Sequence, residues 1–237
     1  MTVKLLHSSP LWLTANAIRM SHDNHELSDS TLSTDGSFVC GEKDKALIDR
    51  VGNKLRHGSV LEMAVVWFEI DGISRTCLQE FSRHRHQSLT VKSTRYTLAK
   101  DLKNEQTFLS PVGFFGWSVG EFGVFTEEAI QRASKYIVLT GDDNVDYASL
   151  MSLELLRRNI QLGISNDKTK YSLPEAVKVK LQTQFNMRSL RNFLELRSAP
   201  SALWEIRELA NKIFEALPED YKFLAEDVMY GNSSRNS

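Results

Sequence analysis

The residues best suited to anion chemistry gather between Phe81 and Lys100, a stretch that contains no Asp or Glu. Its cations alternate with hydroxyl side chains. They are Arg83, Arg85, Lys92, Arg95 and Lys100, interleaved with Ser82, Ser88, Thr90, Ser93, Thr94, Tyr96 and Thr97. Arginine offers a planar fork of N–H donors, and hydroxyls add neutral hydrogen bonds. The stretch therefore predicts a site for a phosphate or a carboxylate.

The alternation around Arg95 indicates an extended segment over 88–97. In such a segment Leu89 and Val91 share a face with Ser93 and Arg95. The apolar pair predicts that this face points inward, so that Ser93 and Arg95 are partly buried. A buried arginine needs a partner, which must be a distant carboxylate or a bound anion. A solvated basic strand, with Arg95 exposed or paired to a remote acid, explains the pattern equally well.

A second cluster of candidate residues lies in Asn186–Arg197. Arg188 and Asn192 stack at helical spacing, and Arg197 falls beside Leu190 and Phe193. Arg197 therefore leans toward the apolar face of a helix, where an unpaired cation is costly. Pairing with Glu205 or another acid would satisfy it, and so would contact with a ligand.

The histidine and cysteine residues indicate neither a metal centre nor a nucleophilic thiol. His84 and His86 lie one residue apart without a nearby third ligand, so we expect hydrogen bonding and no metal. Cys40 and Cys77 have no metal or redox spacing. Cys40 falls in a predicted loop and Cys77 on the apolar face of a predicted helix, so we expect neither to act as a nucleophile.

Hydrophobic periodicity and turn residues predict the elements that must position these side chains. The expected strands are 3–6, 63–70 and 177–185. The expected helices are 11–20, 43–57 (ended by Gly58), 73–83, 125–139, 144–163, 188–197 and 203–217. Residues 22–42 and 101–123 are expected to be loops, the former at the surface. The pattern predicts a single α+β domain over 1–230, helix-rich with a small, mainly antiparallel sheet, and a disordered tail over 231–237.

Composition narrows the class of protein. The chain has 237 residues, with 29 Lys plus Arg against 30 Asp plus Glu, a net charge of −1. This balance excludes a strongly basic nucleic-acid coat and an acidic disordered tail. No apolar run approaches the ~18 residues of a membrane-spanning helix. The first residues lack the layout of a signal peptide, and cysteines are few. We therefore expect a cytoplasmic location with reduced thiols.

Three segments resemble one known family. Arg83-His84-Arg85, followed after seven residues by Ser93, resembles the motif of the flavin-dependent thymidylate synthases (ThyX). Asn186–Arg197 is similar to that family's second block, and Arg56–Glu62 to a third. Because all three occur in the family's order and spacing, the resemblance extends from the first strand to about residue 215.

This resemblance implies a reaction, its cofactors and an assembly. dUMP would receive a methylene group from 5,10-methylenetetrahydrofolate. Reduced FAD would supply the hydride that completes the methyl group of dTMP, and NADPH would reload the flavin. The family's sites are built from several subunits of a homotetramer. We expect exposed apolar residues over 107–125 to suit such an interface. No nucleic-acid or membrane partner is expected.

The resemblance also assigns roles to individual residues. The positions that match FAD contacts are Ser59, Arg83, His84, Arg85, Val91, Asn186, Arg188 and Asn192. The positions that match dUMP contacts are Glu80, Arg83, Val91, Ser93, Arg95, Lys170 and Arg197. Arg197 is the expected catalytic residue, because a guanidinium beside the uracil would stabilise negative charge that develops on the ring.

The chain departs from the commoner family pattern at several positions. Thr90 and Val91 stand where many members have Asn and Glu, so that Val91 would contribute its backbone. Glu80 replaces Gln, Lys170 replaces Arg, and Ser201 stands where some members have His. Two other functions therefore stay open: a catalytically silent homologue, and a nucleotide- or nucleic-acid-binding module.

Overall fold

The computed structural model describes residues 1–21, 23–34, 36, 38–109 and 125–230. The chain divides into two compact units. The first unit comprises Met1–Asp71, Glu80–Thr90 and Leu181–Ser237, and the second comprises Gly72–Gln79 and Val91–Lys180. A single catalytic domain over 1–230 stays a prediction. The predicted tail over 231–237 lies outside the described residues.

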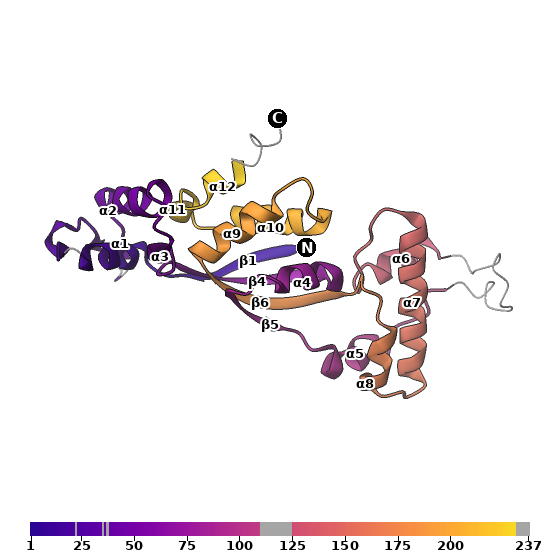
Figure 1. The fold of residues 1–237 in the computed structure, drawn as a ribbon. Coiled ribbons are helices and arrows are strands. Elements are labelled where there is room, and N and C mark those ends of the chain that lie inside the picture. The colour runs from indigo at the N-terminus through magenta and orange to yellow at the C-terminus, as the bar shows by residue number, and fades with distance from the viewer. Residues whose placement is uncertain (22, 35, 37, 110–124, 231–237) are drawn as a thin grey trace. The chain divides into compact units, whose positions relative to one another are not determined.

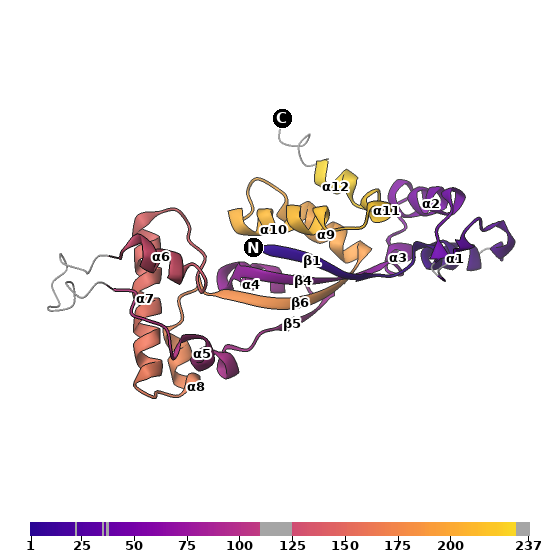
Figure 2. The same cartoon turned by 180° about the vertical axis from the view of Figure 1, so that it is seen from behind.

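A four-stranded sheet has the order β1 (Thr2–Ser8), β4 (Val65–Ser74), β6 (Lys178–Asn186) and β5 (Gln87–Val91) (Figure 1 and, from behind, Figure 2). Strands β1 and β4 pair antiparallel, with a register shift between Leu5 and His7. In β4, Val66, Phe68 and Ile70 are fully buried and alternate with less buried residues. This period of two is what a strand with one buried face requires. The predicted helix-rich α+β class is confirmed.

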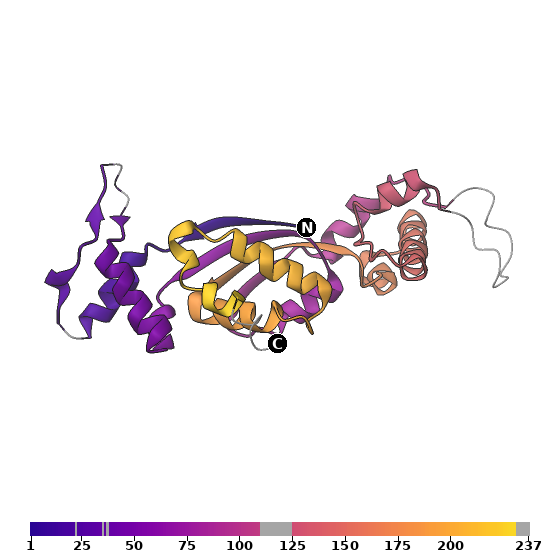
Figure 3. The ribbon, with the colours of Figure 1, turned by 90° about the horizontal axis from the view of Figure 1, so that it is seen from above.

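Two helices of the first unit, α9 (Met187–Arg197) and α10 (Trp204–Glu215), lie over the strands (Figure 3). The buried residues of each helix form an apolar face that packs on the core beneath the helix. Phe193 of α9 meets Phe81 edge to face, with ring centroids 5.3 Å apart, and Phe81 meets Phe185 of β6 at 5.8 Å. Packing of these buried rings fixes the position of α9. The position of the polar side chains on that helix is fixed as a result.

The N-terminal part of the first unit differs from the predicted helix over 43–57. Helix α1 (Leu11–Met20) is as expected, but α2 (Glu42–Ile48) gives way to a π-helical segment, η2 (Asp49–Lys54). Gly58 does not end a helix. It begins α3 (Gly58–Leu61), and the left-handed backbone lies at Arg56, with a φ of 57°. Segments η2 and α3 pack on each other, a contact that local propensity does not reveal.

The predicted surface loop over 22–42 contains a 3₁₀ turn, η1 (His25–Leu27), and a two-stranded sheet of β2 (Thr31–Leu32) and β3 (Phe38–Val39). The buried carboxylate of Asp44 holds this loop in place through hydrogen bonds. Asp44 accepts hydrogen bonds from Arg19 at 2.9 Å and from Ser28 and Ser30 at 2.6 Å each.

At the other end of the chain, two short helices, α11 (Glu219–Lys222) and α12 (Glu226–Tyr230), complete this unit.

The second unit is helical. Besides the start of α4 (Arg75–Ser82), it contains α5 (Thr94–Leu102), α6 (Glu127–Ala133), α7 (Asp143–Gln161), α8 (Asn166–Thr169) and the 3₁₀ turn η4 (Lys170–Ser172). The long predicted helix over 144–163 is confirmed as α7, whereas the one over 125–139 is shorter. The predicted loop over 101–123 is wrong at its start, because α5 continues to Leu102. Its residues from 110 onward lie outside the described part of the chain.

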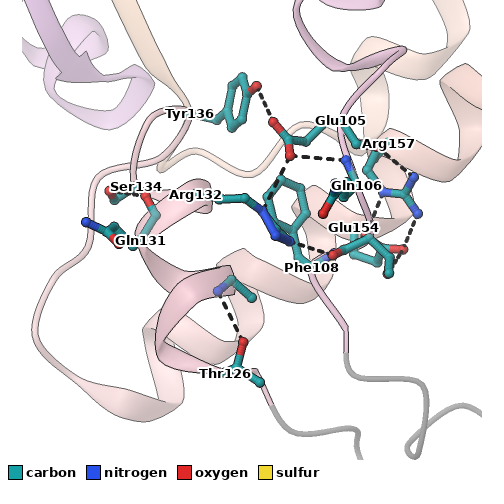
Figure 4. Close-up of polar contacts among 12 residues, drawn as sticks. Glu105, Gln106, Phe108, Thr126, Gln131, Arg132, Ser134, Tyr136, Glu154 and Arg157 are labelled. Carbon is teal, nitrogen blue, oxygen red and sulfur yellow. Dashed lines mark hydrogen bonds and ion pairs between the residues drawn. The ribbon is translucent and has the colours of Figure 1, made fainter.

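A buried polar network fixes the segment after α5 (Figure 4). Arg157 donates to both oxygens of Glu154 at 2.8 and 2.7 Å, and Glu154 also accepts from the backbone N–H of Phe108 at 3.0 Å. Burial alone would raise the pKa of the Glu154 carboxyl, but the hydrogen bonds from Arg157 and Phe108 outweigh it and hold the pKa below its usual range. Glu105 accepts from Tyr136 at 2.8 Å.

The expectation that residues 107–125 expose apolar side chains is wrong at Phe108 and Leu109. Phe108 and Leu109 are 1% and 6% exposed, and Phe108 belongs to the core that α7 helps to form. Phe125 is half-buried, and residues 110–124 lie outside the described part of the chain. Among the described residues, no helix is long and apolar enough to cross a membrane.

Candidate active site

A cavity of about 500 Å³ lies in the first unit, where the loop after α4 faces the start of α9. Its walls carry cationic and neutral hydrogen-bond donors together with one carboxylate. The lining residues are Glu62, His84, Arg85, His86, Asn186, Arg188, Ser189 and Asn192. The structure thus brings together, from segments about 100 residues apart, most of the side chains that the family resemblance assigned to FAD.

The N-terminus of α9 forms one wall of the cavity. Asn186 caps this helix, because its side-chain oxygen accepts from the backbone N–H of Ser189 at 2.9 Å. Arg188 and Ser189 in the first turn line the cavity, and Asn192 lies one turn further. The first-turn N–H groups of a helix carry partial positive charge, so this wall favours an anionic ligand.

The block Arg56–Glu62 meets α9 at Arg188. Arg188 pairs with Glu62, with Nη1 and Oε1 2.7 Å apart. Its side chain also passes close to Gly58, since a Cβ at Gly58 would lie 3.0 Å from Nε and 3.2 Å from Cδ of Arg188. Gly58 therefore leaves room for the Arg188 side chain to pass, and any larger residue would require that side chain to shift by a few tenths of an ångström. Ser59 is exposed on α3 and does not line the cavity.

Three cavity residues, Glu62, His86 and Ser189, had no predicted role. Glu62 and Ser189 lie inside the recognised motif blocks, and His86 directly follows Arg83-His84-Arg85. Position within the blocks is the signal that could have identified them. Residue type alone does not, because a serine, a histidine or a glutamate is ordinary on a surface.

Arg197 is held by three contacts at the end of α9. Its Nη1 lies 2.9 Å from Oε2 of Glu80, and its Nε donates to Nε2 of His84 at 2.9 Å. Its Nη2 donates to the Glu80 carbonyl at 3.4 Å. The other carboxylate oxygen of Glu80 lies 3.4 Å from Nη1 of Arg83. Three residues assigned to dUMP therefore converge in the first unit, and Glu80 supplies a carboxylate that Arg197 was expected to need.

His84 connects the cavity to Arg197. Its ring is half-buried and packs edge to face on Phe193, with centroids 5.1 Å apart. Burial, and then the charge of Arg197, lower the pKa of His84 to about 4. The ring therefore stays neutral near neutral pH, and in the tautomer with its proton on Nδ1 the Nε2 atom accepts from Arg197.

The remaining dUMP positions lie in the second unit. The predicted extended segment over 88–97 with a partly buried Arg95 is wrong, whereas the alternative, an Arg95 that is exposed and paired to a remote acid, agrees with the structure. Strand β5 ends at Val91, Ser93 is the N-cap of α5, and Arg95 lies in the first turn of that helix. Arg95 is exposed and its Nε lies 2.9 Å from Oδ1 of Asp167. A helix forms in place of the predicted extended segment because Leu98 and Leu102, four residues apart, bury one helical face.

Helix α8 joins Arg95 to Lys170. The side-chain amide of Asn166 donates to the backbone carbonyl of Arg95 at 2.8 Å, and Asp167 holds the guanidinium. Lys170 directly follows this helix and is exposed. Val91 is half-buried and Ser93 exposed. The second unit therefore presents two cations and one hydroxyl on neighbouring elements.

Thiol and metal chemistry find little support in the described residues. Within these residues, no three or more His, Cys, Asp or Glu side chains are grouped as metal ligands. Cys40 and Cys77 are buried. Burial raises the pKa of the Cys40 thiol above its usual value, which disfavours a reactive thiolate.

Comparison with known proteins agrees with the arrangement of motif blocks. The family model described as "Thymidylate synthase complementing protein" (Thy1) matches residues 4–220. A flavin-dependent thymidylate synthase of Campylobacter jejuni is 47% identical over 230 residues, 97% of this chain and 98% of that protein. One of Helicobacter pylori is 41% identical over 230 residues, with 97% and 99% covered.

Solved structures agree. The crystal structure of Thymidylate Synthase X (ThyX) from Helicobacter pylori with FAD and dUMP superposes with a TM-score of 0.83 at 40% identity, covering 97% of this chain and 99% of that chain. Sequence, fold and the meeting of the three motif blocks therefore agree. The chain belongs to the thymidylate synthase complementing protein family, the flavin-dependent thymidylate synthases.

Proposed function

We propose that this chain is an FAD-dependent thymidylate synthase that methylates dUMP to dTMP. The observation that carries the proposal is the cavity of about 500 Å³ in which residues of three separate motif blocks meet. The related Helicobacter pylori protein, whose structure contains FAD and dUMP, supports the choice of both ligands.

The donor set of the cavity fits a flavin dinucleotide. Arg85, Arg188 and the N-terminus of α9 offer cationic and backbone donors for a pyrophosphate, and Asn192 offers an amide. We assign FAD binding to Ser59, Arg83, His84, Arg85, Val91, Asn186, Arg188 and Asn192. When bound, FAD supplies the hydride that completes the methyl group.

Arg197 acts on the pyrimidine in this proposal. Its guanidinium is charged at every accessible pH, so it stabilises negative charge on the uracil ring and takes no part as a base. Glu80 and His84 hold three of its nitrogens before substrate arrives. A guanidinium that is already oriented loses little freedom in the reaction.

The phosphate of dUMP is assigned to Ser93, Arg95 and Lys170, with Arg83 and the backbone of Val91 completing the nucleotide site. Asp167 pairs with Arg95 at 2.9 Å, and both side chains are more than half exposed, so a phosphate can replace this weak partner. The carboxylate of Glu80 would repel a phosphate. The carboxylate instead pairs with Arg83 and Arg197, so its role is to orient these arginines and not to contact the phosphate.

The proposal includes partners beyond FAD and dUMP. NADPH is the reductant and 5,10-methylenetetrahydrofolate the carbon donor. The enzyme works in the cytoplasm as a homotetramer whose sites combine residues of several subunits. The resemblance of the motif blocks to the family supports the two co-substrates and the assembly.

Anaerobic turnover tests the proposed function. The purified protein should show flavin absorbance. It should also form dTMP from dUMP when methylenetetrahydrofolate and NADPH are supplied. Flavin binding without dTMP formation would identify a silent homologue. Nucleotide binding without flavin would identify a binding module.

A further inference from the structure

The C-terminal segment 223–227 is tied to α9 through Arg191. Arg191 forms a two-point ion pair with Asp227, at 2.6 and 2.7 Å, and donates to the backbone carbonyl of Leu224 at 2.5 Å. Its side chain is only 16% exposed. An arginine–carboxylate pair with two parallel hydrogen bonds fixes orientation as well as distance. Segment 223–227 therefore constrains the rotation of α9 about its axis.

The same arginine contacts the π-helical segment η2. Arg191 donates to the side-chain oxygen of Asn53 at 3.1 Å. The amide nitrogen of Asn53 donates in turn to the Phe223 carbonyl at 3.0 Å and to Asp49 at 2.9 Å. We call the set Asn53, Arg191, Phe223, Leu224 and Asp227 the C-terminal junction. It joins three segments that are distant in the sequence.

Two of the three segments at the C-terminal junction, α9 and η2, lead to walls of the cavity. Arg191 lies between Arg188 and Asn192, which both line the cavity. Segment η2 leads through Arg56 into Gly58–Glu62, where Gly58 is in close approach to Arg188. There is little room to adjust, since a Cβ at Gly52 of η2 would lie 2.6 Å from Cδ2 of Leu61 in α3. A π-helical turn is itself rare and is often found at functional sites.

The partners of Arg191 in this segment lie beyond the matched part of the family model, which ends at residue 220. The segment does not depend on Asp227 alone. Tyr221 is 1% exposed, and its hydroxyl hydrogen-bonds the backbone carbonyl of Ser9. This second anchor means that a change at Asp227 loosens the C-terminal junction without releasing the segment.

We propose that Arg191 and Asp227 are positioning residues for FAD. They hold α9 against η2, so that Arg188 and Asn192 keep the spacing that the cavity needs. The inference rests on the proposed function, because it takes the cavity to be the FAD site. Neither residue lines the cavity, so their effect on FAD must pass through α9.

Asp227→Asn tests the proposal, because it keeps the size of the side chain and removes its charge. We expect the Kd for FAD to rise about three- to ten-fold. We expect kcat at saturating FAD to stay within two-fold of wild type. Glu219→Gln is the matched control: it breaks an ion pair with Lys222 on the adjacent α11, where Glu219 is 87% exposed, and should leave the Kd unchanged.

Arg191→Lys is the second variant, since lysine keeps the charge and loses the two-point fork. It should weaken FAD in the same way, and the double variant should be no worse than the stronger single one. FAD binding is measured by fluorescence quenching well below the thermal midpoint of each variant. The visible circular dichroism of bound FAD reports on the geometry of its site.

Unchanged FAD affinity in both variants would overturn the proposal, and so would additive effects in the double variant. A lower thermal midpoint with unchanged FAD affinity would show that the C-terminal junction serves stability alone. Wild-type protein that binds no FAD would overturn the proposed function and this inference together. This outcome differs from a failure of the inference alone, because it appears in the wild-type protein before any variant is compared.

Discussion

At the scale of single residues, the site is organised around arginines whose partners are already in place. Arg197 is held by Glu80 and His84, Arg188 by Glu62, and Arg95 by Asp167. Most of these pairs are partly exposed, so each adds little to stability. Their value is orientation, because a guanidinium with a fixed plane presents its N–H groups in one direction.

Arg197→Ala should lower kcat for dTMP formation by about 100- to 1,000-fold, the usual effect of removing an electrostatic stabiliser. The bound-flavin spectrum should change little, because Arg197 does not line the cavity. Arg207→Ala is the control: Arg207 is on α10 and donates to the Pro200 carbonyl at 2.8 Å, and its loss should leave kcat within two-fold. Loss of flavin in Arg197→Ala would contradict the assigned role.

His84 should show no protonation between pH 5.5 and 8, because burial and Arg197 lower its pKa to about 4. The folded-state pKa lies below that of the unfolded chain, ~6.5. The unfolded state therefore binds the extra proton, and this group reduces stability as pH falls from ~6.5 toward 4. Histidine NMR titration, with His84→Gln to assign the signal, measures the midpoint. A midpoint between 6 and 7 would refute the prediction.

At the scale of elements, short polar contacts decide where helices begin and which faces they show. Asn186 caps α9 with a side-chain hydrogen bond and so places Arg188 in the first turn, toward the cavity. Ser93 is the N-cap of α5, and the burial of Leu98 and Leu102 on one face of that helix leaves Arg95 exposed. In the second unit, the buried carboxylate of Glu154 fixes segment 105–109 against α7.

Glu154→Gln should destabilise the protein by about 3–5 kcal/mol, because it leaves the guanidinium of Arg157 buried without its counter-charge. Both side chains are less than 10% exposed. Glu128→Gln, at an exposed position in α6, is the control. Urea unfolding measures the difference, and a loss below 1 kcal/mol would contradict the expected role. In the wild type, this contribution is present above the unfolded carboxyl pKa and is lost as pH falls through the lowered folded-state pKa.

At the scale of the whole molecule, the candidate residues divide between the two units. The first unit contains the cavity together with Glu80, Arg83 and Arg197, and the second contains Val91, Ser93, Arg95 and Lys170. In the proposed function, the first of these sets would serve the pyrimidine and the second the phosphate. A site shared between subunits can combine these sets from different copies.

Mixed tetramers test whether sites are shared. Arg197→Ala and Arg95→Gln should each be nearly inactive, and co-expression should restore part of the activity if one site takes the two arginines from different subunits. Each variant expressed alone is the control. Light scattering should give a mass four times 27.0 kDa. A monomer in solution, or no restoration in a verified mixed tetramer, would count against sharing of these two residues.

Residue types and their local spacing are enough to predict the family, the α+β class and the elements whose burial is periodic. Helix α7, strands β4 and β6, and helix α9 follow from local spacing, since a strand or a helix buries residues at its own period. The motif blocks also identified His84, Arg85, Asn186, Arg188 and Asn192, which the structure brings together.

The partners of those residues become known only from the folded chain. Glu80 and Arg197 are far apart in the chain, and neither is distinguished by local spacing as the other's partner. The closeness of Gly58 to Arg188, the left-handed backbone at Arg56 and the outward turn of Arg95 likewise depend on packing between distant segments. Local patterns record which face an element buries, whereas contacts between elements depend on where the whole chain folds them.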